Sequence, residues 1–210
     1  MTTIARSVYA SVAHRYWRPD WSLAKNREIY GRDASVEGLG ANMRIELEAD
    51  ADLCKEPELS ARLDQLKSLL DHQCVFLPGS KFEREPSTLE NITAYLVENL
   101  NFAESSLSVW ESEHLGCRQE GLLQTLIFKQ RNLTLEIEAS RDPVSGLGIS
   151  RRTVFDAVER LLVKLNGIND PDVQHWGKGI YTLLKADLKG LHSVRVDLGR
   201  HEGLIVQSPN

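Results

Sequence analysis

The stretch NMRIELEA at residues 42–49 returns as NLTLEIEA at residues 132–139, ninety positions later, with four of the eight residues identical. Apolar and polar residues alternate in both stretches, which predicts β-strands that bury one face. The apolar sets are Met43, Ile45 and Leu47 in the first stretch and Leu133, Leu135 and Ile137 in the second. Because short alternating strands resemble each other by chance, the flanking segments decide whether the chain contains a repeated unit.

The segments that follow the two stretches also correspond. Each stretch is followed by two predicted amphipathic helices and then by two short strands. The corresponding pairs are 58–70 with 151–165, 89–100 with 176–188, 107–111 with 193–197, and 116–119 with 204–207. The order strand, strand, helix, helix, strand, strand therefore occurs twice, which is typical of a duplicated unit.

The boundary between the two units is predicted near Glu120 and Gly121, which gives units at 1–120 and 121–210. The second unit opens with strands at 122–130 and 132–139. Because no linker rich in proline or serine separates the units, we expect them to share one sheet. Before the helix at 89–100, Ser87 with Glu90 three residues on predicts a capping box.

Composition and charge limit the classes of function. The chain is 41% hydrophobic and 26% charged, which is typical of a soluble globular protein. A net charge of −5 argues against a nucleic-acid partner such as duplex DNA. The sequence contains no run of eighteen apolar residues, which argues against a membrane span. Arg6, His14 and Arg15 interrupt the N-terminal segment and argue against a signal peptide. Three cysteines without CxxC spacing favour reduced thiols and a cytoplasmic location.

Four short motifs in the first half of the chain resemble motifs of the family of 6-pyruvoyltetrahydropterin and 6-carboxytetrahydropterin synthases. They are AHRY at 13–16, LDH at 70–72, PSTLENITAYL at 86–96 and VWESEHLGC at 109–117. They occur in the family's order over about residues 7–120, whereas the second half matches mainly in layout, with DPVSGLGIS at 142–150 similar to a family stretch. The resemblance implies an α+β tunnelling fold (T-fold), in which antiparallel ββααββ units assemble through oligomerisation into a barrel.

The resemblance implies catalytic roles for residues of the Leu-Asp-His motif at 70–72 and of the segment that follows the first strand. The family's Asp-His pair is catalytic, which makes Asp71 and His72 the candidates for a proton relay. Family members also carry a cysteine a few residues upstream of the second strand. Asp33 and Ser35 stand there in this chain, and Asp33 is the candidate for a second acid or base.

The resemblance also implies a set of residues that bind the substrate. The family's glutamate in VWE grips the pterin, which corresponds to Glu111 here. A carboxylate can accept two parallel N–H bonds from the N–C–N edge of a pterin, a purine or another cyclic amidine. Thr88 is a candidate contact to the ligand ring, and His14, which corresponds to a family zinc ligand, is a further candidate for substrate binding.

The chain departs from the family at the zinc ligands. The family's second strand opens with His-Gly-His, but GLGANM at 38–43 places Leu39 and Ala41 at those positions. Because zinc needs three or four ligands, we expect neither zinc nor another cofactor. Spacing does not select Asp33, Glu37 or His114 as substitutes. In the second half Asn166 and Gly167 replace the Asp-His pair and Asp197 takes the glutamate position, so that unit is predicted to be degenerate.

Each candidate also has a purely structural interpretation. Asp71 and His72 fit a helix end whose dipole a histidine stabilises. The others fit an exposed strand end (Glu111), a helix start (Thr88), a packed strand histidine (His14), a small buried residue (Cys117), and core or interface packing (Tyr16, Trp17 and Trp21).

Two functional hypotheses therefore stay open. The first is a zinc-independent acid–base lyase, isomerase or cyclase that acts on a pterin-like or other small heterocyclic or amine substrate, in a specialised biosynthetic pathway. The second is a non-catalytic T-fold protein that binds a ligand or serves a structural role. Both hypotheses expect a homo-oligomer, because each sheet leaves open edges. Both also expect the cytoplasmic location that the cysteines favour.

Overall fold

A computed structural model describes residues 3–100, 105–120, 123–130, 133–139, 191–197 and 204–207, together with residues 145, 182 and 185. The helices are α1 (Leu23–Tyr30), α2 (Glu56–Leu70) and α3 (Leu89–Leu100), with a 3₁₀ turn, η1, at Gly31–Asp33. The strands are β1 (Thr3–His14), β2 (Leu39–Asp50), β3 (Gln73–Cys74), β4 (Ser105–Ser112), β5 (Leu115–Glu120), β6 (Leu123–Gln130), β7 (Leu133–Ala139), β8 (Leu191–Asp197) and β9 (Leu204–Gln207).

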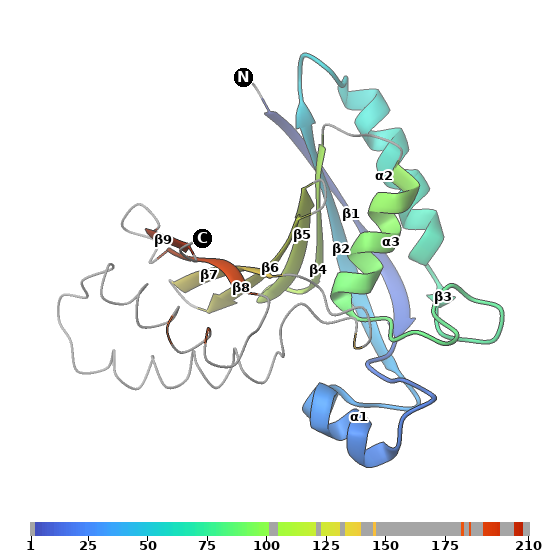
Figure 1. The fold of residues 1–210 in the computed structure, drawn as a ribbon. Coiled ribbons are helices and arrows are strands. Elements are labelled where there is room, and N and C mark those ends of the chain that lie inside the picture. The colour runs from blue at the N-terminus through green and yellow to red at the C-terminus, as the bar shows by residue number, and fades with distance from the viewer. Residues whose placement is uncertain are drawn as a thin grey trace.

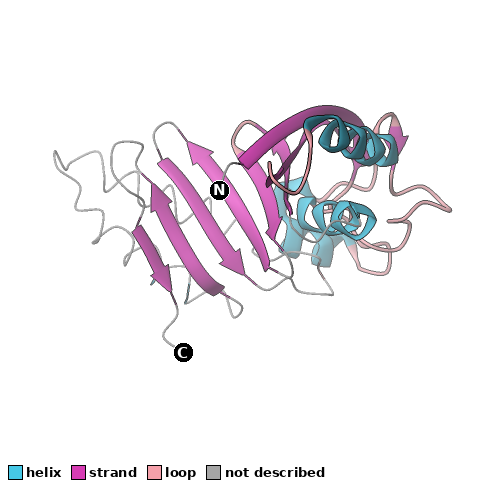
Figure 2. Cartoon of the chain, turned by 90° about the horizontal axis from the view of Figure 1, so that it is seen from above, coloured by secondary structure: helices cyan, strands magenta, loops and turns pink. Residues whose placement is uncertain are grey.

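The described strands form a single nine-stranded sheet in the order β3-β1-β2-β4-β5-β6-β7-β8-β9. Neighbours are antiparallel except for the two-residue strand β3, which runs parallel to β1. The sheet curves strongly, and α2 and α3 lie along one face of its first half (Figure 1 and Figure 2). Because Glu120 of β5 pairs with Leu123 of β6, the sheet continues across the predicted boundary between the units.

The core lies between the helices and one face of the sheet. Alternate residues of β2 enter it, and Met43, Ile45 and Leu47 are fully buried, as the alternation predicts. The leucine stripe of α2 covers them with Leu59, Leu63, Leu66 and Leu70, each at most 1% exposed. In the second half, Leu135 and Ile137 of β7 are equally buried. Both repeated stretches are therefore half-buried strands, and the α+β class is confirmed.

Two local predictions in the first half need correction, and one helix was not predicted. Helix α2 begins at Glu56, two residues before the predicted start. The cap of α3 is Thr88, whose Oγ1 accepts the N–H of Asn91 at 3.2 Å. Ser87 is instead bound to β1, because its Oγ accepts the N–H of Arg15 at 2.7 Å. Helix α1 was not expected from the sequence; it begins after Ser22, whose side chain accepts the N–H of Lys25.

The second half supplies β6, β7, β8 and β9, in the same antiparallel order as β1, β2, β4 and β5. The strand predictions hold to within about two residues at each end. The predicted helices at 151–165 and 176–188 lie outside the described residues except for Thr182 and Lys185, which are helical. Asn166 and Gly167 also lie outside them. The division into two units and the barrel assembly therefore stay predictions, since the described sheet is open, with β3 and β9 at its ends.

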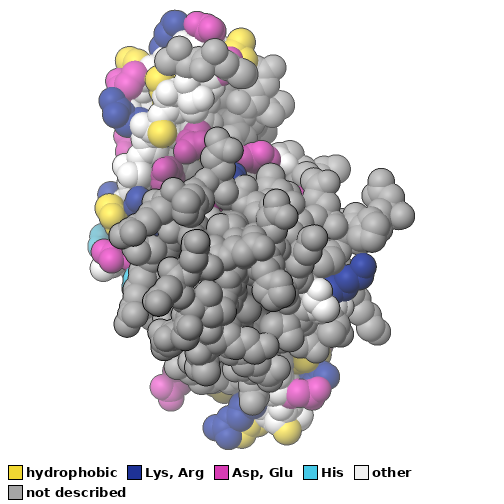
Figure 3. Space-filling view, turned by 90° about the vertical axis from the view of Figure 1, so that its left-hand side faces the viewer, with side chains coloured by type: hydrophobic (Ala, Val, Ile, Leu, Met, Phe, Trp, Pro, Cys, Tyr) yellow, Lys and Arg dark blue, Asp and Glu magenta, His cyan; other side chains and the backbone are white. Residues whose placement is uncertain are grey.

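The surface carries charges of both signs. On the face shown in Figure 3, the coloured Lys and Arg side chains are interspersed with Asp and Glu rather than gathered into a basic stripe. Among the described helices, none combines the length and apolar character needed to cross a membrane.

Candidate functional site

Glu111 lies at a bulge in β4, between Trp110 and Ser112, where the pairing with β5 shifts. A bulge re-aims a side chain, and here the carboxyl group turns toward the end of β1. Its Oε1 lies 3.8 Å from Nε2 of His14, and the side chain is 17% exposed. Its Oε2 accepts the hydroxyl of Tyr16 at 3.0 Å. Glu111 is therefore a largely enclosed carboxyl group, which excludes its interpretation as an exposed strand-end acid.

His14 ends β1 and is fully buried. Its Nδ1 lies 3.2 Å from the carbonyl oxygen of Ser87, just before α3. Because a carbonyl oxygen only accepts, Nδ1 carries the hydrogen of this bond, and Nε2 is the ring nitrogen that faces Glu111. The histidine is thus both packed and directed at the carboxyl group, which joins its structural and functional interpretations.

The electrostatics of the site are set by burial and by a second acid. Burial raises the pKa of Glu111 to about 7, and the negative charge of Asp33 adds to the rise. Asp33 ends the η1 turn that follows α1, so it reaches the site from a third segment. The structure therefore places His14 against Glu111, with Asp33 within electrostatic reach of the carboxyl group, and a carboxyl group with a pKa near 7 suits acid–base work at neutral pH.

A row of aromatic rings leads from this cluster to α1. The ring centroids of His14 and Tyr16 lie 5.6 Å apart, and those of Tyr16 and Tyr30 lie 6.1 Å apart. Tyr30 stacks on Trp21 at 6.0 Å and donates its hydroxyl to the carbonyl of Ser145 at 2.9 Å. These contacts support the packing interpretation for Tyr16 and Trp21.

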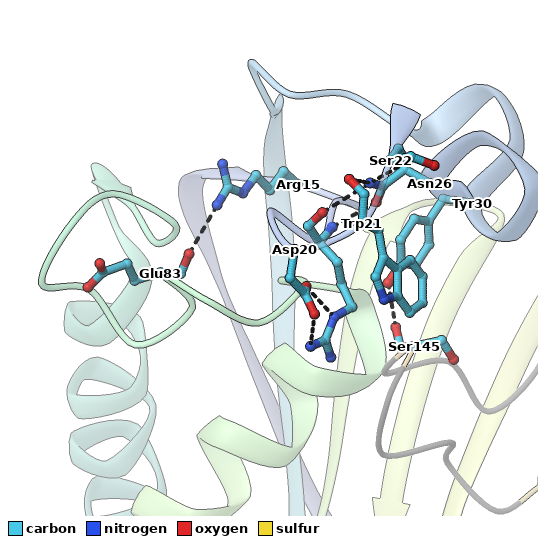
Figure 4. Close-up of polar contacts among 9 residues, drawn as sticks. Arg15, Asp20, Trp21, Ser22, Asn26, Tyr30, Glu83 and Ser145 are labelled. Atoms are coloured by element: carbon cyan, nitrogen blue, oxygen red, sulfur yellow. Dashed lines mark hydrogen bonds and ion pairs between the residues drawn. The ribbon is translucent and has the colours of Figure 1, made fainter. Parts of the chain in front are cut away.

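The loop before α1 is fixed by its own polar contacts (Figure 4). Asn26 of α1 is fully buried, and its Nδ2 donates to the carbonyl groups of Arg18, Trp21 and Ser22 at 3.0, 3.3 and 3.2 Å. Its Oδ1 accepts the N–H of Arg18 at 2.8 Å. A buried amide that holds three carbonyl groups makes this loop a defined support for the segment that carries Asp33.

Asp71 and His72 lie directly after α2, beside β1. The Oδ1 of Asp71 accepts the N–H of Ser11 at 2.9 Å, and this bond lowers the pKa of Asp71, with smaller effects from His72 and Lys67. The N–H of His72 donates to the carbonyl of Ser11 at 2.7 Å. Its backbone has a φ of +57°, and its side chain is 84% exposed with Nε2 3.9 Å from Oδ2 of Asp71. The pair is anchored through the aspartate, and the imidazole projects outward.

The imidazole borders a shallow groove of about 460 Å³. Cys74, Ser11 and Asn42 line it with His72, whereas His14, Asp33 and Glu111 do not. Among the described residues, this groove therefore includes one set of candidates and not the other. We predict that the two sets meet in a cleft at a subunit or unit interface, with Glu111 at its floor and Asp71 and His72 at its side.

The residues present do not fit the zinc that the resemblance implies. In the register of β1 with β2, Leu39 lies opposite His14 and Ala41 opposite Val12. Directly paired residues share a face of the sheet, so both stand beside His14 where ligands would be needed. Neither side chain has a donor atom. Among the described residues there is no group of three or more His, Cys, Asp or Glu side chains that could hold a metal ion.

The remaining candidates have structural places. Thr88 is buried as the cap of α3. Cys117 is fully buried in β5, as its small-residue interpretation expects. Ser35 donates its hydroxyl to the carbonyl of Gly38 at 3.3 Å. The polar role of Tyr16 was missed, although its position two residues after His14 was the available signal.

Comparisons with known proteins agree with the motifs. No family model matches the chain. The chain is 26% identical over 98 residues to 6-pyruvoyl tetrahydrobiopterin synthase of Drosophila melanogaster, an alignment that covers 43% of this chain and 58% of that protein. The chain thus spans less than two thirds of that relative. Its fold is similar to the structure of Caenorhabditis elegans 6-pyruvoyl tetrahydropterin synthase, with a TM-score of 0.50 and 20% identity over 57% of this chain and 95% of the other.

Proposed function

We propose that this chain, a distant relative of the 6-pyruvoyl tetrahydropterin synthases, binds a pterin-like heterocycle through Glu111 and carries out zinc-independent acid–base chemistry on it. The observation that supports this most is the enclosed carboxyl group of Glu111, which lies against His14 and within electrostatic reach of Asp33. The Drosophila relative is a 6-pyruvoyl tetrahydrobiopterin synthase, and the resemblance implies that the glutamate of the VWE motif binds the pterin in that family.

Glu111 suits recognition of a cyclic amidine. An ionised carboxyl group can accept two parallel N–H bonds from an N–C–N edge, and such charge-assisted bonds are stronger than neutral ones. Because burial raises the pKa of Glu111 to about 7, the group is partly protonated near neutral pH. A ligand that donates two N–H bonds favours the ionised form, so binding releases a proton from the free protein's neutral fraction.

The second part of the proposal concerns the proton relay. Asp71 is fixed by the N–H of Ser11, and His72 projects from it into the open groove. An exposed imidazole can reach a substrate held by a neighbouring copy of the chain. We therefore place the complete site between copies, with His72 as general acid or base oriented by Asp71, and Asp33 as a further acid or base. Proton abstraction, elimination, isomerisation and ring closure are the reaction types open to this set.

A fluorescence titration with 2-amino-4-oxopteridine tests the ligand class. We expect saturable binding that Glu111→Ala weakens by a hundredfold or more, since it removes a double charge-assisted bond. Glu113→Ala is the matched control, because Glu113 is an exposed acid two residues on, in the turn that follows β4. A pteridine whose 2-amino group is dimethylated should bind weakly to the unaltered protein. Equal binding of both compounds would contradict the proposed double hydrogen bond between the ligand and Glu111.

The alternative is a ligand-binding protein without turnover. The observation that favours it is the loss of donor atoms at Leu39 and Ala41, opposite and next to His14 on one face of the sheet. The two functions are distinguished by His72→Gln. This variant removes the relay and leaves Glu111 in place, so a catalyst loses turnover but retains binding.

A further inference from the structure

Tyr16 joins the segments that make up the Glu111 site. It lies two residues beyond the end of β1, is 1% exposed, and its backbone bridges to Ala34, next to Asp33. Its hydroxyl accepts the N–H of Leu89 at 3.1 Å and donates to Oε2 of Glu111 at 3.0 Å. One phenol group therefore contacts both the start of α3 and the candidate ligand anchor.

The direction of these bonds is fixed by chemistry. The backbone N–H of Leu89 only donates, so the phenol oxygen accepts it, and the ionised carboxylate of Glu111 only accepts, so in that state the phenol hydrogen is donated to Glu111. Leu89 is the first residue of α3, and N–H groups of a first helical turn have no acceptor within the helix. They also lie at the positive end of the helix dipole, which polarises the hydroxyl and strengthens its bond to the carboxyl group.

We propose that Tyr16 is a positioning residue that fixes the carboxyl plane of Glu111 for ligand binding. With Oε2 held by the hydroxyl, Oε1 is the oxygen on the side of His14. Both oxygens retain lone pairs for a ligand, but the side chain no longer has to be ordered when the ligand arrives. The gain in affinity comes from this preorganisation. The inference rests on the proposed role of Glu111 as the ligand anchor.

The chain offers a closely matched pair of variants. Tyr16→Phe removes the hydroxyl and keeps the ring contacts to His14 and Tyr30. Tyr30→Phe removes a hydroxyl from the next ring of the same row, and that hydroxyl donates to the carbonyl of Ser145. Tyr16→Phe loses the hydrogen bonds to Leu89 and Glu111, and Tyr30→Phe loses the hydrogen bond to Ser145, beside the same aromatic contacts. Only the first loses a bond to Glu111.

The experiment measures the dissociation constant of 2-amino-4-oxopteridine by fluorescence for both variants, for Glu111→Ala, and for Tyr16→Phe combined with Glu111→Ala. We expect Tyr16→Phe to weaken binding by about tenfold or more, the scale of a hydrogen bond to a charged group. Tyr30→Phe should stay within about twofold of the unaltered protein. In the Glu111→Ala background, Tyr16→Phe should add less than about twofold, because a residue that acts through Glu111 has no effect once Glu111 is absent.

The outcomes separate this inference from the proposed function. If Glu111→Ala binds the pteridine as the unaltered protein does, the ligand anchor is wrong, and the role of Tyr16 falls with it. If Glu111→Ala weakens binding but Tyr16→Phe does not, or if the two effects add independently, the anchor stands and the positioning role is overturned. Thermal unfolding accompanies each titration. A Tyr16→Phe protein that fails to fold would also overturn the inference, since the hydroxyl would then serve the fold.

Discussion

Replacing Glu111 by glutamine should remove a pH-dependent loss of stability. Burial and Asp33 raise the pKa of Glu111 from 4.5 to about 7 in the folded protein, so the folded state binds the proton more tightly than the unfolded chain. A raised pKa stabilises the fold fully below about pH 4.5, and this contribution is lost as pH rises through about 7. At about 1.36 kcal/mol per pH unit, the rise corresponds to about 3 kcal/mol. Since the side chain is only 17% exposed, solvent screening reduces this value little.

Urea unfolding between pH 4 and pH 8.5 measures this effect. The free energy of unfolding of Glu111→Gln minus that of the unaltered protein should increase by about 3 kcal/mol between pH 4.5 and 7.5 and stay level above that range. Glu113→Gln, at an exposed position two residues on, is the control and should give a difference that does not change with pH. A flat difference for Glu111→Gln would refute the reasoning, because it would mean that Glu111 is solvated as in the unfolded chain.

Three further predictions concern the relay, the metal and the sheet. His72→Gln should lower kcat by about a hundredfold or more. His72→Gly should lower kcat in the same way and also raise the free energy of unfolding by about 1 kcal/mol, because glycine relieves the strain of a φ of +57°. Wild-type turnover by either variant would show that His72 has no role in a proton relay. Elemental analysis should find no stoichiometric zinc, and chelators should leave ligand binding unchanged. One zinc per chain would contradict this prediction and would require donor side chains elsewhere, because Leu39 and Ala41 have none. Gly116→Ala should destabilise the protein by about 1–3 kcal/mol in urea unfolding, because its Cβ would lie 2.6 Å from the ring of Trp110, and an unchanged unfolding midpoint would show that the ring can move.

The elements that the sequence predicted well are those with strong periodic patterns. The leucines of α2 recur at helical spacing, and the apolar residues of β2 and β7 alternate, so local sequence alone specifies them. Helix α1 lacks such a stripe, because its buried residues are Asn26 and Tyr30. The helix is held by the Ser22 cap and by the contacts of Asn26 and Tyr30, which no periodicity reveals.

The site was harder to predict than the fold. The resemblance named Glu111, His14 and Asp33, but their proximity depends on contacts between residues far apart in the chain. Tyr16 and Glu111 are 95 positions apart, and a bulge in β4 directs the carboxyl group. The cap of α3 shows the same limit at short range: Ser87 and Thr88 both suit an N-cap, and the bond from Arg15 to Ser87 leaves the capping to Thr88.

The continuous pairing of β5 with β6 has a consequence for the symmetry of an assembly built from this chain. In a ring of identical single units, every site between units is a copy of every other, so a substitution that removes one ligand removes it everywhere. Two units joined in one polypeptide are no longer equivalent, and each can change without the other. The Asp71–His72 pair of the first half and the Asn166–Gly167 pair of the second are what such independent change would leave in a sequence. A ring built from this chain would need half as many polypeptides for the same circumference, and its sites would be of two kinds.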